Sequence, residues 1–408
     1  MILPRIMQAK IIIGKSFGDE GKGLATDTYA LEAVRSGLSA ICVRHNGGAQ
    51  AGHTVDLPDR RFVFSQLSSA SFRGLDTYWV DSFMPDLYKL TAEVSGFAEA
   101  GGQVPAIYAS PKCRCTYIGD VLINMILETS RGEARHGSCG MGINEAKLRS
   151  EEHPLLLGDV VGRGAGELFR NLTELTAGYT PKRLSELGID IGRAGEYGEM
   201  LFSADVLRNA AEAMCRGAEL VQLREQDFLL RFDELIFEGA QGLLLDELNL
   251  EYAPHLTSSR TGLHEPARIL RSLCGGNAPD TEVVYVTRSY VTRHGAGKLS
   301  YEGMLDPTEY GITDRTNVPN EWQGSLRFAP HGSCEEFTAA VLRDLSECDI
   351  PVQRTLFVTH LNETGGCMLT ADGVVPATEF CRNEKIAELF DSFRFSRTPF
   401  AEDVTTEK

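Results

Sequence analysis

The sequence predicts an α/β protein with one large, mostly parallel, doubly wound sheet, helices on both faces and long loops. A β-branched, buried strand is expected at residues 8–13, followed by a glycine-rich loop and a helix. A second buried strand, AICVR, comes next at residues 40–44. A strand, a loop, a helix and another buried strand in this order are typical of a parallel sheet covered by helices.

Later segments continue this pattern without a break. The chain has no internal repeat and no Pro- or Ser-rich linker, so residues 1–408 are expected to form a single elaborated domain. Apolar stretches at residues 234–237, 281–286 and 355–358 are expected to be further strands, and residues 204–224 and 334–345 to be helices.

The composition excludes several classes of protein. A formal net charge of −17 and a pI of about 5.1 argue against the extended basic face of a nucleic-acid binder. No apolar run approaches the ~20 residues that span a membrane, and the short apolar start has no small-residue cleavage site. The ten cysteines match no common zinc spacing, so buried free thiols in a reducing cytosol are expected. We therefore expect a cytoplasmic protein without nucleic-acid or membrane partners.

The loop after the first strand reads GKSFGDEGKG at residues 14–23. Its glycines let backbone amides converge on phosphate oxygens, the next helix adds its dipole, and Lys22 adds a charge. Six residues separate Gly14 from Gly21, where a strict P-loop has four, and Gly23 replaces the hydroxyl residue. The spacing leaves two interpretations open, a phosphate-binding loop and a tight structural turn.

Two residues in the glycine loops suggest chemistry. Asp19 is unusual because a carboxylate repels phosphate; it is expected to hold Mg²⁺ or to remove a proton, with a helix N-cap as the simpler alternative. A second loop, GGAQAGHT at residues 47–54, follows the second strand, at the end where open α/β sheets bind ligands. We expect His53 in this loop to act in catalysis or to contact phosphate. Long irregular segments at residues 131–144, 239–262 and 311–332 are expected to be active-site loops.

These two loops resemble those of adenylosuccinate synthetases, whose signatures are Gly-Asp-Glu-Gly-Lys-Gly and a glycine loop that ends in Ala-Gly-His-Thr. Further segments resemble the family in the same order, and the matches span about residues 8–400. As an ordered set they are highly specific. They are GSCGMGI at 137–143, FEGAQG at 237–242 with LLD at 244–246, Tyr252 and Pro254 with LTSS at 256–259, and TRHGAG at 292–297.

The resemblance implies a P-loop-related α/β ligase that joins aspartate to C6 of an IMP-like purine nucleotide. In the family, an aspartate removes the N1 proton, so that O6 attacks the γ-phosphate of a nucleoside triphosphate, and a histidine stabilises the charge passing between them. Asp19 and His53 match these residues. Asp19 and the Gly52 carbonyl match the Mg²⁺ ligands, and Lys22 and Gln241 complete the implied catalytic set.

The resemblance also implies binding residues for three substrates and a homodimer. In the family, an arginine of one subunit reaches the other's 5′-phosphate, and Arg149 is the closest candidate by position. The residues implied for the phosphate donor are Gly18, Glu20, Gly21, Gly23, Gly52, Thr54, His360, Asn362 and Pro399. Those for the purine monophosphate are Gln50, Ser138, Cys139, Arg149, Gln241, Thr257 and Arg293, and those for the amino acid are Thr313, Arg315 and Arg327.

The sequence departs from the family at the loops that select substrates. Leu24 replaces a lysine of the phosphate loop, and the arginine cluster of the amino-acid loop is reduced to Arg315 and Arg327, which leaves the amino acid open. The family reads guanine with Lys-x-Asp, and His360 and Asn362 occupy these places. Because an asparagine amide suits the adenine edge, ATP or dATP is the expected donor and GTP the alternative.

Other functions stay open beside the housekeeping reaction. The changed donor residues, with Thr398-Pro399 in place of Gly-Pro, resemble a phage branch that makes 2-aminoadenylosuccinate from dGMP. That branch has a serine where Asp19 is retained here. A specialised ligase for a modified purine nucleotide is therefore the first alternative, and a catalytically inactive nucleotide-binding homologue the second. The loop spacing and Asp19 count against a plain P-loop kinase or GTPase.

Overall fold

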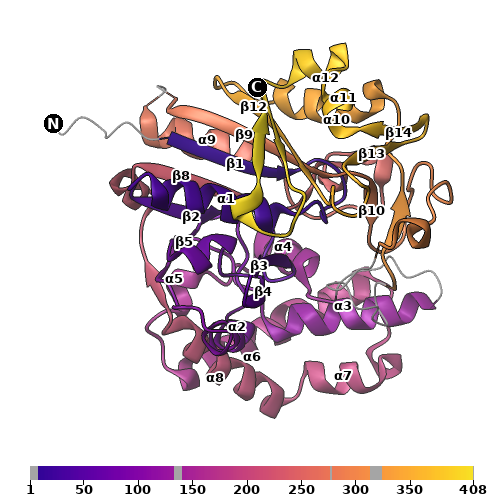
Figure 1. Ribbon diagram of the computed structural model, residues 1–408. Helices are drawn as coiled ribbons and strands as arrows, with labels where there is room; N and C mark the ends of the chain where they lie inside the picture. The colour runs from indigo at the N-terminus through magenta and orange to yellow at the C-terminus, as the bar shows by residue number, and fades with distance from the viewer. Residues whose placement is uncertain (1–7, 133–139, 276–277, 313–323, 408) are drawn as a thin grey trace.

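The computed structural model describes residues 8–132, 140–275, 278–312 and 324–407. Ten strands form one sheet through the middle of the molecule (Figure 1). Neighbouring strands run parallel throughout, except for the pair at the C-terminal edge, β15 and β16. In their order across the sheet, the strands are β16 (Thr405–Glu407), β15 (Ser392–Phe395), β12 (Gln353–Thr359), β9 (Asp280–Arg288), β1 (Gln8–Gly14), β8 (Glu234–Gly242), β2 (Ala40–Arg44), β5 (Asp76–Trp79), β6 (Ile107–Ala109) and β7 (Val221–Leu223).

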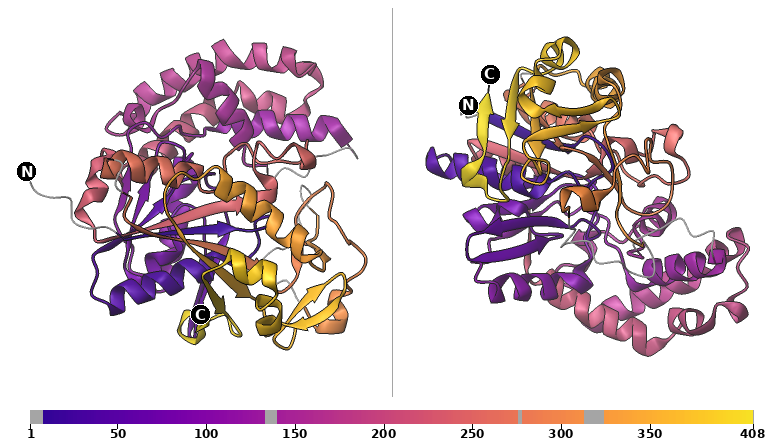
Figure 2. Two further views of the ribbon diagram at one scale, coloured as in Figure 1. Left: turned by 90° about the horizontal axis from the view of Figure 1, so that it is seen from above. Right: turned by 45° about the vertical axis from the view of Figure 1, so that its right-hand side comes forward.

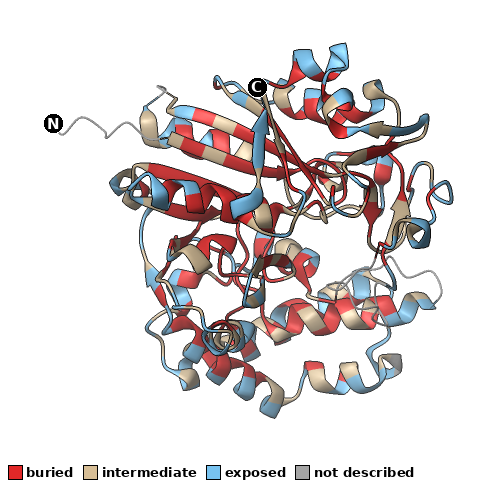
Figure 3. Ribbon diagram, viewed as in Figure 1, coloured by how far each residue is buried: buried red, intermediate tan, exposed pale blue. Residues whose placement is uncertain are grey.

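Helices cover both faces of this sheet, as the sequence predicts. Side chains alternate between the two faces of a strand, and in β1 Ile12 packs with α1 (Lys22–Arg35), whereas Ile11 and Ile13 pack with α9 (His264–Cys274) and α10 (Cys334–Ser346). Figure 2, seen from above, shows α1 and α9 on opposite sides of the central strands. The strands are buried along most of their length (Figure 3). The predicted doubly wound fold is confirmed.

A helical layer lies beside the β5–β6 end of the sheet, in the lower part of Figure 1. Trp79 of β5 and Ile107 of β6 share a buried cluster with side chains of α2, α5, α6 and α8. Among the described residues, no helix is both long and apolar enough to cross a membrane. The helices not yet given are α2 (Leu87–Glu99), α3 (Ile118–Arg131), α4 (Ile143–Glu152), α5 (Leu157–Val160), α6 (Ala165–Glu186), α7 (Gly195–Leu201), α8 (Ala204–Ala218), α11 (Ala377–Cys381) and α12 (Glu384–Leu389).

Three small antiparallel pairs stand apart from the main sheet. They are β3 (His53–Leu57) with β4 (Arg60–Phe64), β10 (Val291–Arg293) with β11 (Arg327–Ala329), and β13 (Cys367–Thr370) with β14 (Gly373–Pro376). Two of these pairs contain residues that the sequence links to substrates, His53 in β3 and Arg293 in β10.

The central strands end at a common edge. Gly14 of β1 pairs with Gly242 of β8 and with Val286 of β9, and Val358 of β12 pairs with Thr287 of β9. Since parallel strands share their direction, the loops that follow them meet at this carboxyl edge. The fold therefore gathers the glycine loops, Gln241 and the 360–362 turn from distant parts of the sequence.

Two details differ from or extend the sequence-based expectations. The helix expected at 204–224 ends at Ala218, and residues 221–223 form strand β7. Pairing with β6 decides this, because a short segment at a sheet edge gains backbone hydrogen bonds that a frayed helix end lacks.

The nine described cysteines are all free, and no group of three or more His, Cys, Asp or Glu in the described part could hold a metal.

Candidate active site

The loop after β1 is braced from within by the carboxylate of Glu20. Its Oε1 atom accepts hydrogen bonds from the backbone N–H groups of Ser16 at 2.9 Å and Gly18 at 2.8 Å. The Lys22 ammonium donates to the Gly18 carbonyl at 2.5 Å and lies 3.2 Å from Glu20 Oε2. A Cβ atom at Gly14 would lie 2.3 Å from this carboxylate, so the strand must end in glycine. Glu20 and Lys22 therefore shape the loop, with both side chains buried inside it.

The start of α1 packs closely against two neighbouring strands. A Cβ atom at Gly23 would lie 2.4 Å from the carbonyl oxygen of Thr54 in β3, and the Thr359 hydroxyl at the end of β12 donates to the Glu20 carbonyl at 2.6 Å. The N-cap of α1 is Gly21, and no side chain caps the helix. The alternative that Asp19 is this cap is therefore wrong.

Asp19 faces a cavity at the carboxyl edge, with its side chain 26% exposed. Its backbone carbonyl accepts a hydrogen bond from Nε of Arg288. Its Oδ2 atom lies 3.8 Å from Nε2 of His294, in the turn after β10. Arg288 thus holds the backbone of Asp19, while the carboxylate stays accessible to a ligand.

His53 is held by a buried carboxylate from β8. Its Nδ1 atom lies 2.8 Å from Oε1 of Glu238, which also accepts hydrogen bonds from the backbone N–H (3.1 Å) and hydroxyl of Ser69 and lies 3.7 Å from Arg44. Burial alone would raise the pKa of Glu238, but His53, Arg44 and these hydrogen bonds together hold the pKa at about 2. Burial lowers the pKa of His53. The ionised Glu238 accepts a hydrogen bond from the Nδ1–H group of His53, which leaves Nε2 of His53 for a ligand.

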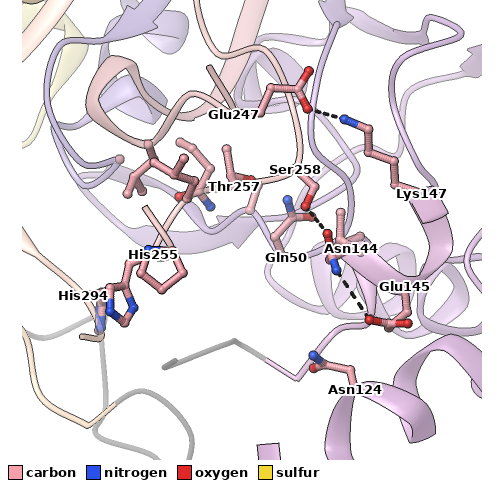
Figure 4. A pocket seen from close by; sticks show the side chains of 18 of the residues that line it. Gln50, Asn124, Asn144, Glu145, Lys147, Glu247, His255, Thr257, Ser258 and His294 are labelled. Carbon is pink, nitrogen blue, oxygen red and sulfur yellow. Dashed lines mark hydrogen bonds and ion pairs between the residues drawn. The ribbon is translucent and has the colours of Figure 1, made fainter. Parts of the chain in front are cut away.

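The two glycine loops open on a cavity of about 700 Å³ (Figure 4). Gln241 joins them from the end of β8, in a left-handed conformation with φ of 64° that few non-glycine residues adopt. Such a conformation is often kept at functional sites. The residues expected at the site that line this cavity are Gly18, Asp19, Gln50, Gly52, His53, Gln241, Thr257 and Arg293.

Arg293 lies under the wall of the cavity and is 1% exposed. Its guanidinium donates to the carbonyls of Lys298 at 2.6 Å and His255 at 3.2 Å, and its Cζ lies 4.5 Å from the centroid of the Phe17 ring. Burial, with some repulsion from Arg327, lowers the pKa of Arg293 to about 10. Its Nε atom is buried and has no hydrogen-bond partner among the described residues.

Arg149 does not reach a phosphate, and this expectation is wrong. The side chain is fully buried on α4 and forms two hydrogen bonds of 2.8 and 2.9 Å with the carboxylate of Asp120. Its remaining bonds go to the carbonyls of His153 and Cys115, both at 2.8 Å. All three guanidinium nitrogens are engaged inside the subunit, so none is free for a ligand of a partner.

Arg327, expected at the amino-acid site, bonds neighbouring carbonyl groups and a carboxylate. It donates from Nε and Nη2 to the Gly295 carbonyl at 3.1 and 2.8 Å, from Nη2 to the Gly297 carbonyl at 2.9 Å, and from Nη1 to Glu302 at 2.8 Å. These bonds hold the turn that carries His294. The other residues expected at the amino-acid site, Thr313 and Arg315, and two expected at the purine monophosphate, Ser138 and Cys139, lie outside the described residues.

The residues expected to read the donor base lie at the carboxyl end of β12. His360 has a left-handed backbone with φ of 59°, and its Nδ1 atom lies 3.2 Å from Oε1 of Glu363. Asn362 and Pro399 are exposed. The backbone N–H of Leu361 donates to the Ser396 carbonyl at 3.3 Å, which brings the 360–362 turn next to the segment that carries Pro399. The two segments could therefore contact one base, although none of these residues lines the cavity of Figure 4.

Several residues that line the cavity or hold its side chains were not identified from the sequence. Glu238 could have been, because a carboxylate inside the apolar segment ELIFEG signals a buried, paired charge. His294 lies within the quoted motif TRHGAG, but only the fold brings it to Asp19. Lys147 and Glu247 form an ion pair between α4 and the segment after β8 (Figure 4). No sequence spacing signals that contact.

Comparison with known proteins identifies the family of the chain. The sequence model of the adenylosuccinate synthetase family matches residues 11–317. The chain belongs to the adenylosuccinate synthetase family. It is thus a nucleotide-dependent ligase that forms a C–N bond. Adenylosuccinate synthetase of Pseudomonas aeruginosa is 28% identical over 351 residues, which cover 82% of this chain and 73% of that protein. The Neurospora crassa synthetase is 27% identical over 333 residues, 77% of this chain and 68% of that protein.

Two solved structures share the fold of this adenylosuccinate synthetase family member. Fully ligated adenylosuccinate synthetase of Plasmodium falciparum superposes with a TM-score of 0.67 at 17% identity, covering 98% of this chain and 99% of that chain. Succinoaminodeoxyadenylate synthetase of cyanophage S-2L, bound to dGMP and dATP as an energy donor, gives a TM-score of 0.63 at 14% identity, covering 98% and 95%. The chain is a divergent member of the family.

Proposed function

We propose that the chain phosphorylates O6 of an IMP-like purine monophosphate with a nucleoside triphosphate and then joins aspartate to C6. The products are adenylosuccinate or an analogue, a nucleoside diphosphate and phosphate. The observation that carries the proposal is the convergence of Asp19, His53 and Gln241 on one cavity from the ends of three different strands or loops. A carboxylate, an imidazole and an amide at one cavity suit proton removal, charge stabilisation and orientation of a purine ring.

The first step uses Asp19 as the base. Its accessible carboxylate removes the N1 proton, and the electron pair shifts through the ring to O6. O6 then bonds to the γ-phosphorus while the bond to the leaving diphosphate breaks. His53 acts at the transferred group through Nε2, because Glu238 holds Nδ1 and thereby fixes the ring. A negative phosphoryl group at Nε2 favours the protonated imidazole, which can then donate a hydrogen bond.

The second step replaces the phosphate on C6. The amine of aspartate attacks C6 and the bond between C6 and O6 breaks. Phosphate leaves with the electron pair, and the attacking nitrogen releases one proton. Gln241 and Thr257 are proposed to hold the purine monophosphate, Gln241 at the ring and Thr257 at the 5′-phosphate. Little bond chemistry falls to the protein itself, so positioning accounts for most of the catalysis.

A Mg²⁺ site at Asp19 and the Gly52 carbonyl fits the residues present. Both line the cavity, and one carboxylate with one carbonyl leaves positions for water and phosphate oxygens, as Mg²⁺ prefers. When bound, the ion neutralises phosphate charge during transfer. We also propose a homodimer, which sedimentation at micromolar protein tests.

The test is a reaction of purified protein with Mg²⁺, aspartate, ATP, dATP or GTP, and IMP or dGMP. We expect phosphate release that depends on all three substrates, and a product heavier than the starting nucleotide by the aspartyl group. A product from dGMP but not from IMP would favour the specialised ligase. Nucleotide binding without phosphate release would favour the inactive homologue.

A further inference from the structure

An ion pair joins two segments that line the same cavity as Thr257. The Nζ atom of Lys147, on α4, pairs with Oε2 of Glu247, in the segment after β8 (Figure 4). Beside it, the Ser258 hydroxyl donates to Oδ1 of Asn144 at 2.5 Å, and this bond also joins α4 to the facing wall. These four residues line the cavity together with Thr257.

Lys147 and Arg131 are the two described lysine or arginine residues of the cavity with partly exposed side chains, and Lys147 is the better able to change its partner, because Arg131 pairs with the buried carboxylate of Glu128. Arg149, two residues further along α4, is buried and bonded to Asp120, and Arg293 is buried beneath the Phe17 ring. The side chains of Lys147 and Glu247 are 30% and 27% exposed, and an ion pair of such exposure is weak. The long, flexible lysine side chain can therefore leave the carboxylate for a stronger anion.

The start of α4 adds to the attraction for an anion. Its N-cap, Gly142, has a left-handed backbone and no side-chain cap bond, and it lines the cavity together with Ile143, Asn144 and Lys147. The first N–H groups of a helix lack intrahelical partners, and the helix dipole places positive charge there. The helix end, the ammonium and the hydroxyls of Thr257 and Ser258 thus face the same space.

We propose that Lys147 binds the 5′-phosphate of the purine monophosphate within its own subunit, and that Glu247 holds the ammonium until the phosphate displaces it. The inference rests on the proposed function for the nature of the ligand. It assigns to Lys147 the charge that Arg149 cannot supply. A phosphate carries more charge than the carboxylate of Glu247 and accepts bonds from the hydroxyls and the helix end at once. Glu247 is therefore a competitor of the ligand rather than its partner.

The experiment is calorimetric binding of IMP and of inosine, or of dGMP and deoxyguanosine, to the full chain and three variants. Lys147→Gln should weaken monophosphate binding about 10- to 100-fold, the range for a lost charged hydrogen bond, and change nucleoside binding by less than about twofold. Glu247→Gln should bind the monophosphate at least as tightly as the wild type. Lys182→Gln removes another exposed lysine, which pairs with Glu152 and lies 4.0 Å from Glu186, and serves as the control.

Three results would overturn the assignment. They are equal weakening of monophosphate and nucleoside by Lys147→Gln, no weakening at all, or a loss in Glu247→Gln as large as that in Lys147→Gln. The last result would mean that the ion pair of Lys147 and Glu247 stabilises the fold and does not compete with the ligand. Because binding is measured without turnover, a chain that follows the expected pattern but forms no product would refute the proposed reaction and leave the role of Lys147 intact.

Discussion

The Nδ1 atom of His53 lies 2.8 Å from Oε1 of Glu238, which links the second glycine loop to the buried end of β8. Glu238 in turn lies 3.7 Å from Arg44 and bonds Ser69, so the imidazole is fixed by a charge that is itself fully buried. Such an arrangement sets both the tautomer and the direction of the ring.

Glu238→Gln should lower kcat about 10²-fold while the KM values change little. The amide no longer stabilises the imidazolium that forms during transfer, and it can leave the ring in the wrong tautomer. Steady-state phosphate release measures this. Glu93→Gln is the control, because Glu93 is also a carboxylate bonded to backbone N–H groups, those of Ser65, Gln66 and Leu67. An unchanged kcat in Glu238→Gln would show that His53 needs no such support.

The same carboxylate should contribute to stability in a pH-dependent way. Its pKa is about 2 in the folded protein, below the ordinary value of 4.5. A depressed folded pKa gives stability that is fully present above the unfolded value and is lost as pH falls from about 4.5 towards 2. The difference in unfolding free energy between wild type and Glu238→Gln, from urea titrations at several pH values, should therefore shrink below about pH 4.5. A difference independent of pH would contradict the assignment.

Asp19→Asn should keep nucleotide binding and thermal stability but lose about 10²- to 10⁴-fold in kcat, the usual range for loss of a general base. Because Gly21 caps α1, no loss of helix capping is expected. Single-turnover assays, with the nucleoside triphosphate limiting and the purine monophosphate in excess, test the loss in rate. Thermal melting tests the unchanged stability. Turnover near the wild-type rate would refute Asp19 as the base.

Arg149→Met should destabilise the fold by about 3–5 kcal/mol, because the variant leaves the Asp120 carboxylate buried without its partner. The KM for the purine monophosphate, measured on the folded fraction at low temperature, should stay within about threefold. Urea unfolding and steady-state kinetics decide the matter. A stable variant with a strongly raised KM would restore Arg149 to the phosphate site.

From the asparagine at position 362, we predict that ATP or dATP is the phosphate donor. With guanine bound, the NH2 group of the Asn362 amide would face a donor of the base. A donor left without an acceptor costs ~1–3 kcal/mol, which corresponds to about a 5- to 150-fold preference for adenine. Asn362→Asp should shift kcat/KM towards GTP, since a carboxylate accepts both donors of the guanine edge. The comparison of kcat/KM for the three triphosphates checks this. A wild-type preference for GTP of tenfold or more would mean that Asn362 does not read the base.

The sequence by itself predicted the parallel sheet with helices on both faces, the first glycine loop with its following helix, and the strands at 40–44 and 355–358. These features follow from local patterns, since buried β-branched runs and glycine spacing act over a few residues. Asp19 and His53 were singled out in the same way, because their motifs lie directly after strands, where ligands bind. Gln241 was assigned only from the resemblance to adenylosuccinate synthetases.

Only the tertiary structure decided what each charged side chain does. Arg149 and Arg327 looked like ligand-binding arginines, but their guanidinium groups bond Asp120 and the carbonyls of the Gly295–Gly297 turn. The partners of Glu238 and Lys147 lie 185 and 100 residues away in the sequence. A charge pairs with whatever the fold brings within a few ångströms, and that distance depends on the packing of strands and helices far apart in the chain.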